Sequence, residues 1–205
     1  MANISSKSPN LQRQSGLVSF DERVVALRQA PYIFWFTGLS GSGKTSIAIE
    51  LEKRLFDRGA LVYHLDADDL RQTVNADLGF TQEDREQNIR RAAGVARILQ
   101  DAGLIVLATF ITPTESSRQA ARAIARQGLF REIYVKAALE TCIARDPKGF
   151  YARALRGEIS DYTGVESIFE DPQHPDLVLD TDQNDIHGCV NQLMDLVEKL
   201  GVLGG

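Results

Sequence analysis

A glycine-rich loop between an apolar run and a helical pattern constrains this chain more than any other feature. Residues 38–45 read GLSGSGKT and match the pattern G-x-x-x-x-G-K-[ST]. The apolar run YIFWFT at 32–37 precedes the loop and is typical of a strand covered on both faces, and a helical pattern follows from about 44 to 58. The order of strand, loop and helix is that of a phosphate-binding loop.

The residue types in this loop suit a nucleoside triphosphate. Glycines allow backbone N–H groups to converge on phosphate oxygens because no Cβ blocks the approach, and the start of the helix adds the positive end of its dipole. Lys44 supplies a charge to the β- and γ-phosphates, and Thr45 supplies a hydroxyl to Mg²⁺. The predicted binding residues are Gly38, Ser40, Gly41, Ser42, Gly43, Lys44 and Thr45.

Apolar runs and helical patterns alternate along the rest of the chain. Further strands are predicted at 60–65, 104–110, 132–137 and 176–180, and further helices at about 18–30, 84–101, 115–126, 139–145 and 185–200. Such alternation behind a glycine-rich loop predicts an α/β fold in three layers, with a five-stranded parallel sheet and helices on both faces. We expect a flexible tail at 1–16 and a single domain at 17–205.

Residues 147–173 do not fit this alternation. The segment contains three glycines and scattered charges, and its apolar periodicity is weak. A stretch of this length in a compact domain is typical of a functional loop, and we interpret it as a mobile lid, with a plain surface excursion as the alternative.

Composition and charge exclude several classes of protein. The net charge of −5 disfavours a general nucleic-acid binder, and no apolar run approaches the ~20 residues that span a membrane. The charge is uneven, because residues 156–205 hold 11 acidic and 2 basic residues. Cys142 and Cys189 form no metal-binding or redox pattern, which favours two idle thiols and a cytoplasmic location.

Acidic residues follow the second predicted strand, at Asp66, Asp68 and Asp69. The carboxyl ends of adjacent parallel strands share one crevice, so Asp66 and Asp68 are expected to face the transferring phosphoryl group. One of them would bind Mg²⁺ or its waters, and the other would accept a proton from a hydroxyl. The alternative is that these acids cap the next helix, which applies most to Asp69.

Basic, amide and aromatic side chains come next and suit an anionic acceptor. Arg85 and Asn88 are three residues apart and share a helix face. Arg71 and Arg85 carry the planar fork that pairs with phosphate or sulfate. Phe80 is equally suited to packing in the core and to stacking on a base.

The motifs after the loop resemble the adenylylsulfate kinase family. DADDLRQTVNADLGFTQEDREQNIRR (66–91) resembles that family's acceptor-binding stretch, and FITP (110–113), RDPKGFY (145–151) and GEISDYTGVESIFEDP (158–172) follow in the family's order. The chain departs from the family pattern at Ala67, Asp69, Thr112, Thr114 and Glu115, and Tyr162 replaces a phenylalanine. The resemblance runs from about residue 34 to 179.

The resemblance implies a three-layer P-loop kinase fold and one reaction. ATP, with Mg²⁺, would phosphorylate the ribose 3′-hydroxyl of adenosine 5′-phosphosulfate and give 3′-phosphoadenosine 5′-phosphosulfate and ADP in sulfate assimilation. Arg71, Arg85 and Asn88 would hold the phosphosulfate or ribose, and Phe80 and Tyr162 would sandwich the adenine.

The resemblance assigns further roles around the acceptor and ATP. Ile111 and Thr112 would line the acceptor pocket, Lys148 would neutralise the acceptor or the transferring phosphoryl group, and Arg145 would approach ATP. The predicted catalytic residues are Lys44, Asp66, Asp68 and Lys148, with Thr45 and Asp66 at the metal. The resemblance also implies a homodimer.

Two other functions stay open from the sequence. One is a kinase of the same fold that acts on a different nucleotide acceptor in a specialised pathway. The other is a nucleotide-binding partner module with little catalysis, although such a module has no need of Lys44, Asp66, Arg85 and Lys148 together.

Overall fold

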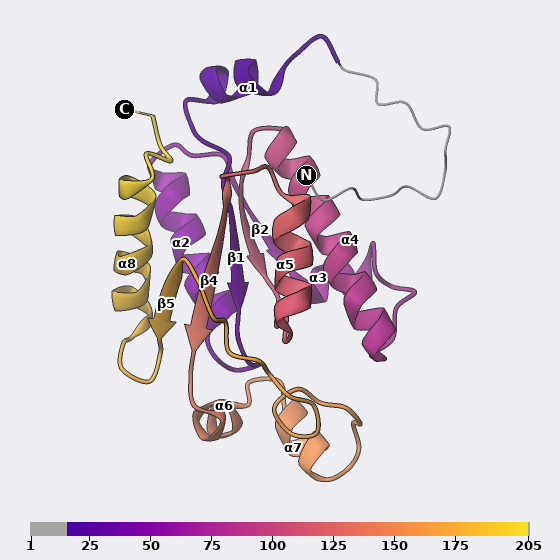
Figure 1. Ribbon diagram of the computed structural model, residues 1–205. Coiled ribbons are helices and arrows are strands. Elements are labelled where there is room, and N and C mark those ends of the chain that lie inside the picture. Colours follow the sequence, from indigo (N-terminus) through magenta and orange to yellow (C-terminus); the bar gives the residue numbers. More distant parts are fainter. Residues whose placement is uncertain (1–15, 205) are drawn as a thin grey trace, which may run out of the picture.

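The computed structural model describes residues 16–204, and five parallel strands form one sheet in the order β2-β3-β1-β4-β5 (Figure 1). The strands are β1 (Ile33–Thr37), β2 (Val62–Asp66), β3 (Ile105–Thr109), β4 (Phe130–Lys136) and β5 (Leu177–Asp180). The predicted α/β fold with a five-stranded parallel sheet is therefore confirmed. The predicted tail at 1–16 lies outside the described residues, apart from Gly16.

Helices cover both faces of the sheet. They are α1 (Phe20–Leu27), α2 (Lys44–Asp57), α3 (Ala67–Gln72), α4 (Gln82–Asp101), α5 (Glu115–Ile124), α6 (Leu139–Arg145), α7 (Phe150–Leu155) and α8 (Ile186–Lys199). The helices α2 and α8 pack together on one face, and α4 and α5 pack together on the other (Figure 1). Within residues 16–204, no helix has the length and apolar character needed to cross a membrane.

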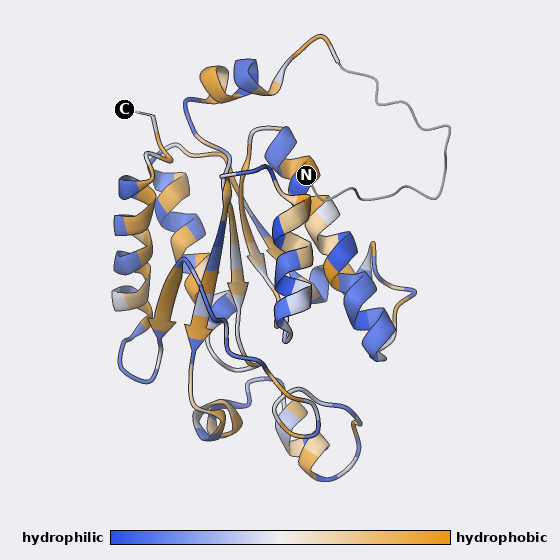
Figure 2. Cartoon of the chain, in the orientation of Figure 1, coloured by the Kyte–Doolittle hydropathy of each residue, from blue (hydrophilic) through white to orange (hydrophobic). Residues whose placement is uncertain are grey.

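Alternating side chains of β1 enter two separate cores. Phe34 and Phe36 belong to the core under α2 and α8, whereas Ile33 and Trp35 belong to the core under α4 and α5. All four side chains are at most 1% exposed. This double burial explains why the strand reads as a continuous apolar run, and Figure 2 shows the apolar strands between helices with polar outer faces.

The structure corrects the predicted elements in several places. Two short helices, α3 and α7, were not predicted, and β4 begins at Phe130 rather than at 132. The first helix ends at Leu27 rather than at residue 30, because Arg28 adopts a left-handed conformation with φ 51°. Helix α4 begins two residues early because the Thr81 hydroxyl accepts from the Asp84 N–H and caps it.

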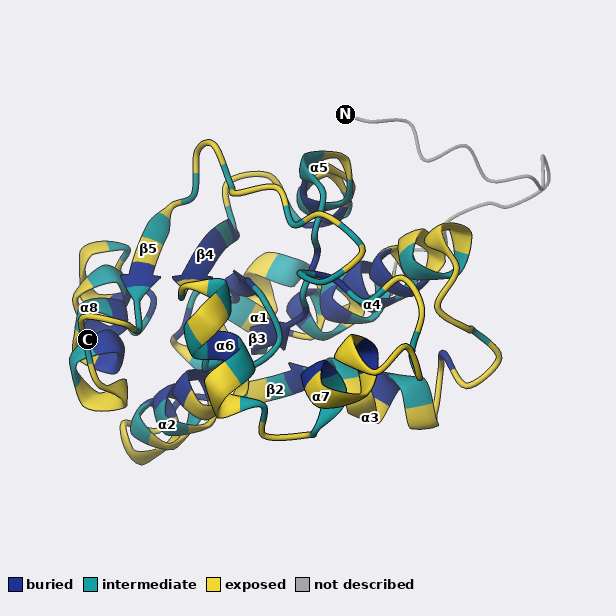
Figure 3. Ribbon diagram, turned by 90° about the horizontal axis from the view of Figure 1, so that it is seen from below, coloured by how far each residue is buried: buried dark blue, intermediate teal, exposed yellow. Residues whose placement is uncertain are grey.

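The carboxyl ends of the strands meet α6, α7 and the loops of residues 147–173 (Figure 1). Figure 3 views this end directly and shows α6 and α7 lying across it. In open parallel sheets, ligands bind in the crevice at this end. The fold therefore places the glycine-rich loop after β1 and the acidic residues after β2 at the same edge.

Candidate active site

The loop between β1 and α2 is shaped by glycines that no other residue could replace without strain. Gly38 has φ 144°, and a Cβ at this position would lie 2.3 Å from the Val135 carbonyl oxygen. Gly43 has φ 102° and no side chain caps the start of α2, which leaves its first N–H groups directed at the loop. The loop therefore forms an anion-binding end of a helix.

Lys44 lies inside the loop rather than in solvent. Its Nζ donates to the carbonyls of Gly38 at 2.9 Å and Leu39 at 2.6 Å, and the residue is 9% exposed. Burial lowers the pKa of Lys44 to about 8. Phosphate oxygens beside this ammonium would favour its charged form.

Asp66 lies at the end of β2 and accepts three hydrogen bonds. Its Oδ2 accepts from Thr45 Oγ1 at 3.2 Å and from Thr109 Oγ1 at 2.8 Å, and its Oδ1 accepts from the Asp68 N–H at 2.8 Å. Partial burial opposes ionisation of Asp66, but these hydrogen bonds and the neighbouring His64 together outweigh it and lower the pKa. Asp66 thus also caps α3.

Thr45 and Asp66 have the donor chemistry that suits Mg²⁺. Hydroxyl and carboxylate oxygens are hard ligands, and Mg²⁺ uses one or two protein ligands together with phosphates and waters. The described residues contain no group of three or more His, Cys, Asp or Glu side chains that would hold a metal by themselves. The pair therefore fits a cation that arrives with a nucleotide.

Asp68, in the first turn of α3, forms an ion pair with Lys148. The two side chains are 51% and 49% exposed, so the pair is solvated and contributes little stability by itself. Its effect is geometric, because it connects α3 to the start of the segment 147–173.

The predicted acceptor residues Arg71 and Phe80 lie against each other. The Arg71 guanidinium carbon lies 4.3 Å from the centre of the Phe80 ring, and Nη1 donates to the Gly79 carbonyl at 3.0 Å. Phe80 is 64% exposed, so it is not a core residue. Of the two interpretations of Phe80, exposure beside an arginine favours a ring that is available for stacking.

Arg85 joins α4 to the segment 147–173. Its Nε donates to the Phe80 carbonyl at 2.8 Å and its Nη1 to Thr163 Oγ1 at 2.8 Å. Its Nη2 donates to the Asp161 carbonyl. One guanidinium therefore connects the backbone of Phe80 to both neighbours of Tyr162.

Asn88, one helical turn after Arg85, is buried and hydrogen-bonded to Asn75. It is 6% exposed, and its Oδ1 accepts from Asn75 Nδ2 at 2.9 Å. Tyr162 makes edge contacts with Tyr151 and Phe150, at ring-centre distances of 5.1 and 6.3 Å.

The hydroxyl of Thr112, a residue predicted to line the acceptor pocket, is bonded within the core. Its Oγ1 accepts from Trp35 Nε1 at 2.9 Å, and the residue is 1% exposed with φ 45°. The neighbouring Ile111 carbonyl accepts from Thr37 Oγ1 at 2.6 Å. Both Ile111 and Thr112 border the large cavity described below, and the Thr112 hydroxyl is already engaged by Trp35.

Arg145, at the end of α6, lies beside the phosphate loop. Its Nη1 donates to Thr181 Oγ1 at 3.0 Å and its Nη2 to the Thr181 carbonyl at 2.9 Å. The Thr181 hydroxyl in turn donates to the Ser42 carbonyl at 3.0 Å. Arg145 thereby ties the end of β5 to the loop.

A single cavity of about 1620 Å³ brings most of these residues together. Its walls include Ser40, Gly41, Gly43, Lys44, Thr45, Asp66, Asp68, Arg71, Phe80, Arg85, Asn88, Ile111, Thr112, Arg145, Lys148 and Tyr162. Two predicted residues, Gly38 and Ser42, are absent from the walls, and both are buried. Asp69 is also absent from them, so its extra negative charge does not face the cavity.

The cavity also includes residues that the sequence analysis missed. Thr109 ends β3 beside Asp66, and the walls also include Thr163, Thr181 and residues 184–187. The rule that selected Asp66 would also have selected Thr109, because both end neighbouring strands.

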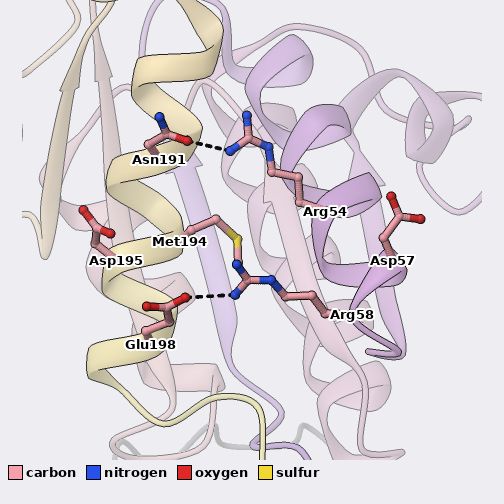
Figure 4. Close-up of a pocket in the computed structure, with 7 residues that line it drawn as sticks. All are labelled: Arg54, Asp57, Arg58, Asn191, Met194, Asp195 and Glu198. Atoms are coloured by element: carbon pink, nitrogen blue, oxygen red, sulfur yellow. Dashed lines mark hydrogen bonds and ion pairs between the residues drawn. The ribbon is translucent and has the colours of Figure 1, made fainter.

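A second, smaller pocket lies on the outer surface between α2 and α8 (Figure 4). Its two arginines are already bonded: Arg54 to Asn191 at 2.6 Å and Arg58 to Glu198 at 2.9 Å. None of the residues predicted to bind ATP or the acceptor lines this pocket.

Known proteins resemble this chain along most of its length. The family model described as Adenylylsulphate kinase matches residues 30–180. An adenylyl-sulfate kinase of Clostridium kluyveri is 45% identical over 93% of this chain and 96% of its own length. The bifunctional enzyme NodQ of Azospirillum brasilense is 44% identical over 96% of this chain but only 32% of its own length.

Solved structures agree with these relatives. The structure of the Mycobacterium tuberculosis APS kinase CysC in complex with AMPPNP and APS superposes with a TM-score of 0.80. The two sequences are 42% identical, and the match covers 83% of this chain and 99% of the other.

Proposed function

The chain belongs to the adenylylsulphate kinase family, and we propose that its 1620 Å³ cavity is the site where it phosphorylates adenosine 5′-phosphosulfate (APS). The enzyme transfers the terminal phosphoryl group of ATP to the ribose 3′-hydroxyl of APS, with Mg²⁺, and gives 3′-phosphoadenosine 5′-phosphosulfate and ADP. One observation carries the site assignment: the phosphate loop and the acceptor residues Phe80, Arg85 and Asn88 line the same cavity.

On the ATP side, the backbone N–H groups of the loop bind the phosphates. Lys44 leaves its carbonyl partners and pairs with the β- and γ-phosphates, and Arg145 borders the nucleotide. Thr45 and Asp66 would hold Mg²⁺, and the bound ion would neutralise charge on the phosphates. The proposal is supported by the 3.2 Å separation of the Thr45 and Asp66 oxygens beside the loop.

On the acceptor side, Arg71, Arg85 and Asn88 bind the phosphosulfate or ribose, and Phe80 and Tyr162 stack on the adenine. Ile111 and the backbone of Thr112 border the ring. Asp68 accepts the proton of the 3′-hydroxyl, and Lys148 neutralises the phosphoryl group. Positioning and charge neutralisation supply most of the catalysis in phosphoryl transfer, so little covalent chemistry is required of the protein.

The segment 147–173 acts as a lid over both nucleotides and excludes water as a competing acceptor. Its contacts with α3 through Lys148 and with α4 through Arg85 support this proposal. A single domain at 17–205, a homodimer and a cytoplasmic location complete the proposal. The location is supported by Cys142 and Cys189, which are free and buried.

A direct assay tests the function. The protein is incubated with ATP, Mg²⁺ and APS, and in parallel with other nucleotides as acceptors, and the products are identified by mass spectrometry. We expect 3′-phosphorylated APS. Turnover only on another acceptor would favour the second kinase hypothesis, and no turnover on any acceptor would contradict both.

Lys44→Ala should abolish this turnover, because the β- and γ-phosphates then lose the ammonium that the phosphate loop supplies. Lys53→Ala is the matched control, since Lys53 lies on the same helix but is exposed and paired with Asp57. Equal activity of the two variants would contradict the role of the loop.

A further inference from the structure

A chain of hydrogen bonds lies behind Asp66 and has no part in the roles given above. Asp66 of β2 and Thr109 of β3 are register partners, and His64 lies two residues before Asp66, so all three side chains share one face of the sheet. His64 Nε2 lies 2.9 Å from Thr109 Oγ1, and Thr109 Oγ1 lies 2.8 Å from Asp66 Oδ2.

The Thr109 hydroxyl has a single proton, and this determines which atom is the donor in each of the two hydrogen bonds. The ionised Asp66 carboxylate is an acceptor only, so the Thr109 proton is directed to it. The Thr109 oxygen can then only accept from His64. His64 must therefore donate through Nε2–H. Water competes little, because Thr109 is 2% exposed and the His64 side chain 12%.

The same carboxylate orients the phosphate-loop threonine. Asp66 Oδ2 accepts from Thr45 Oγ1 as well as from Thr109, and Oδ1 is occupied by the Asp68 N–H. When the Thr45 proton is directed to Asp66, the lone pairs of Thr45 point elsewhere and are available to a cation. A carboxylate that could rotate freely would not hold the Thr45 hydroxyl in this way.

We propose that His64 and Thr109 are positioning residues, which hold Asp66 in the orientation that makes Thr45 a ligand of Mg²⁺. The proposal rests on the metal role of Thr45 and Asp66 proposed above. Neither His64 nor Thr109 needs to contact a nucleotide for this role, since both act through Asp66.

Binding of the non-hydrolysable analogue AMPPNP tests the proposal without turnover. Its affinity is measured by calorimetry with and without Mg²⁺, in the wild type and in two variants of Thr109. Thr109→Val keeps the shape of the side chain and removes the hydroxyl, whereas Thr109→Ser keeps the hydroxyl and removes the methyl group.

We expect Thr109→Val to weaken binding in the presence of Mg²⁺ by about 10-fold, which is typical when an outer hydrogen-bond partner of a metal ligand is lost. Binding without Mg²⁺ should not change. Thr109→Ser should bind AMPPNP in the presence of Mg²⁺ as tightly as the wild type. His64→Phe should weaken binding in the presence of Mg²⁺, as Thr109→Val does.

The outcomes separate this proposal from the metal site on which it rests. Mg²⁺-dependent binding that is the same in wild type and Thr109→Val would overturn the positioning role alone. Equal losses in Thr109→Val and Thr109→Ser would also overturn it, because packing rather than the hydroxyl would then matter. A wild type without any Mg²⁺ effect would contradict the metal site itself.

The tautomer of His64 gives a second readout that needs no metal. Nitrogen-15 NMR of the histidine rings in the free protein distinguishes Nε2–H from Nδ1–H, and His64→Phe assigns the His64 signals. The exposed His174 and His187 serve as internal references. We expect a proton on Nε2 of His64, and a neutral ring with its proton on Nδ1 would overturn the proposal.

Discussion

Gly38 occupies a position at which the backbone itself excludes a side chain. Replacement by alanine would place a Cβ 2.3 Å from the Val135 carbonyl and would require φ 144° of an L-residue. We expect Gly38→Ala to lower the free energy of unfolding by at least about 1 kcal/mol and to abolish ATP binding, as measured by urea unfolding and calorimetry.

Gly94→Ala is the matched control. Gly94 lies within α4, and a Cβ there would meet nothing within 4 Å. Removing a helical glycine should raise the free energy of unfolding by about 0.5–1 kcal/mol and leave ATP binding intact. If both alanine variants had the same stability and ATP affinity, the close approach of β4 to the loop would not explain the need for glycine at position 38.

The ring of Phe80 should contribute to APS affinity rather than to stability. Phe80 is 64% exposed, so Phe80→Ala removes little packing. We expect it to weaken APS binding by about 1–3 kcal/mol, the usual value of base stacking, with the affinity for AMPPNP unchanged. Calorimetric titration with APS measures this effect, and an unchanged APS affinity would show that Phe80 does not stack on the acceptor.

Arg85 connects α4 to the segment 147–173 through hydrogen bonds. Arg85→Ala removes its hydrogen bonds to Asp161 and Thr163, and we expect faster amide hydrogen exchange across 158–168 together with weaker APS binding. Arg90→Ala, at an exposed position on the same helix, is the control. Faster exchange in the control alone, or in neither variant, would contradict this coupling.

The helices and strands could be predicted from the sequence where a segment is long enough to show its apolar periodicity. Shorter elements could not be predicted. The central strands β1 and β3 are apolar runs because both sheet faces are covered there, and α4 carries a clear apolar stripe at Ile89, Ala92 and Ala96. Helices α3 and α7 have six residues each, too few for a helical period to show. Helix α3 exists because Asp66 caps it directly at the end of a strand.

The candidate site was predictable in its residue types but not in its bonding. The sequence indicated the loop, the acids after β2 and the basic residues of α4, and most of them line one cavity. It could not indicate that the Thr112 hydroxyl bonds Trp35, because this contact depends on a left-handed backbone at Thr112. The pair of Asp68 with Lys148 spans 80 residues and has no local signal.

The basic and acidic residues of the molecule are concentrated in different parts of the structure. Basic side chains outside residues 156–205 line the cavity, among them Lys44, Arg71, Arg85 and Lys148. The acidic residues of 156–205 belong largely to the segment 147–173, β5 and α8. A net charge of −5 therefore disfavours an extended polyanion, while the cavity itself suits two small anionic nucleotides.

Because the cavity walls come from α2, α3, α4 and the segment 147–173, the two nucleotides together should close the molecule more than either alone. We expect amide hydrogen exchange across 147–173 to slow most when Mg²⁺–AMPPNP and APS are both bound. Lys148→Ala should weaken this extra protection, because the pair that connects the segment to Asp68 is lost. Lys136→Ala is the control, since Lys136 ends β4 and its exposed side chain pairs with Asp180. Protection in the ternary complex that is no greater than with Mg²⁺–AMPPNP alone would show that the segment is a fixed wall rather than a lid.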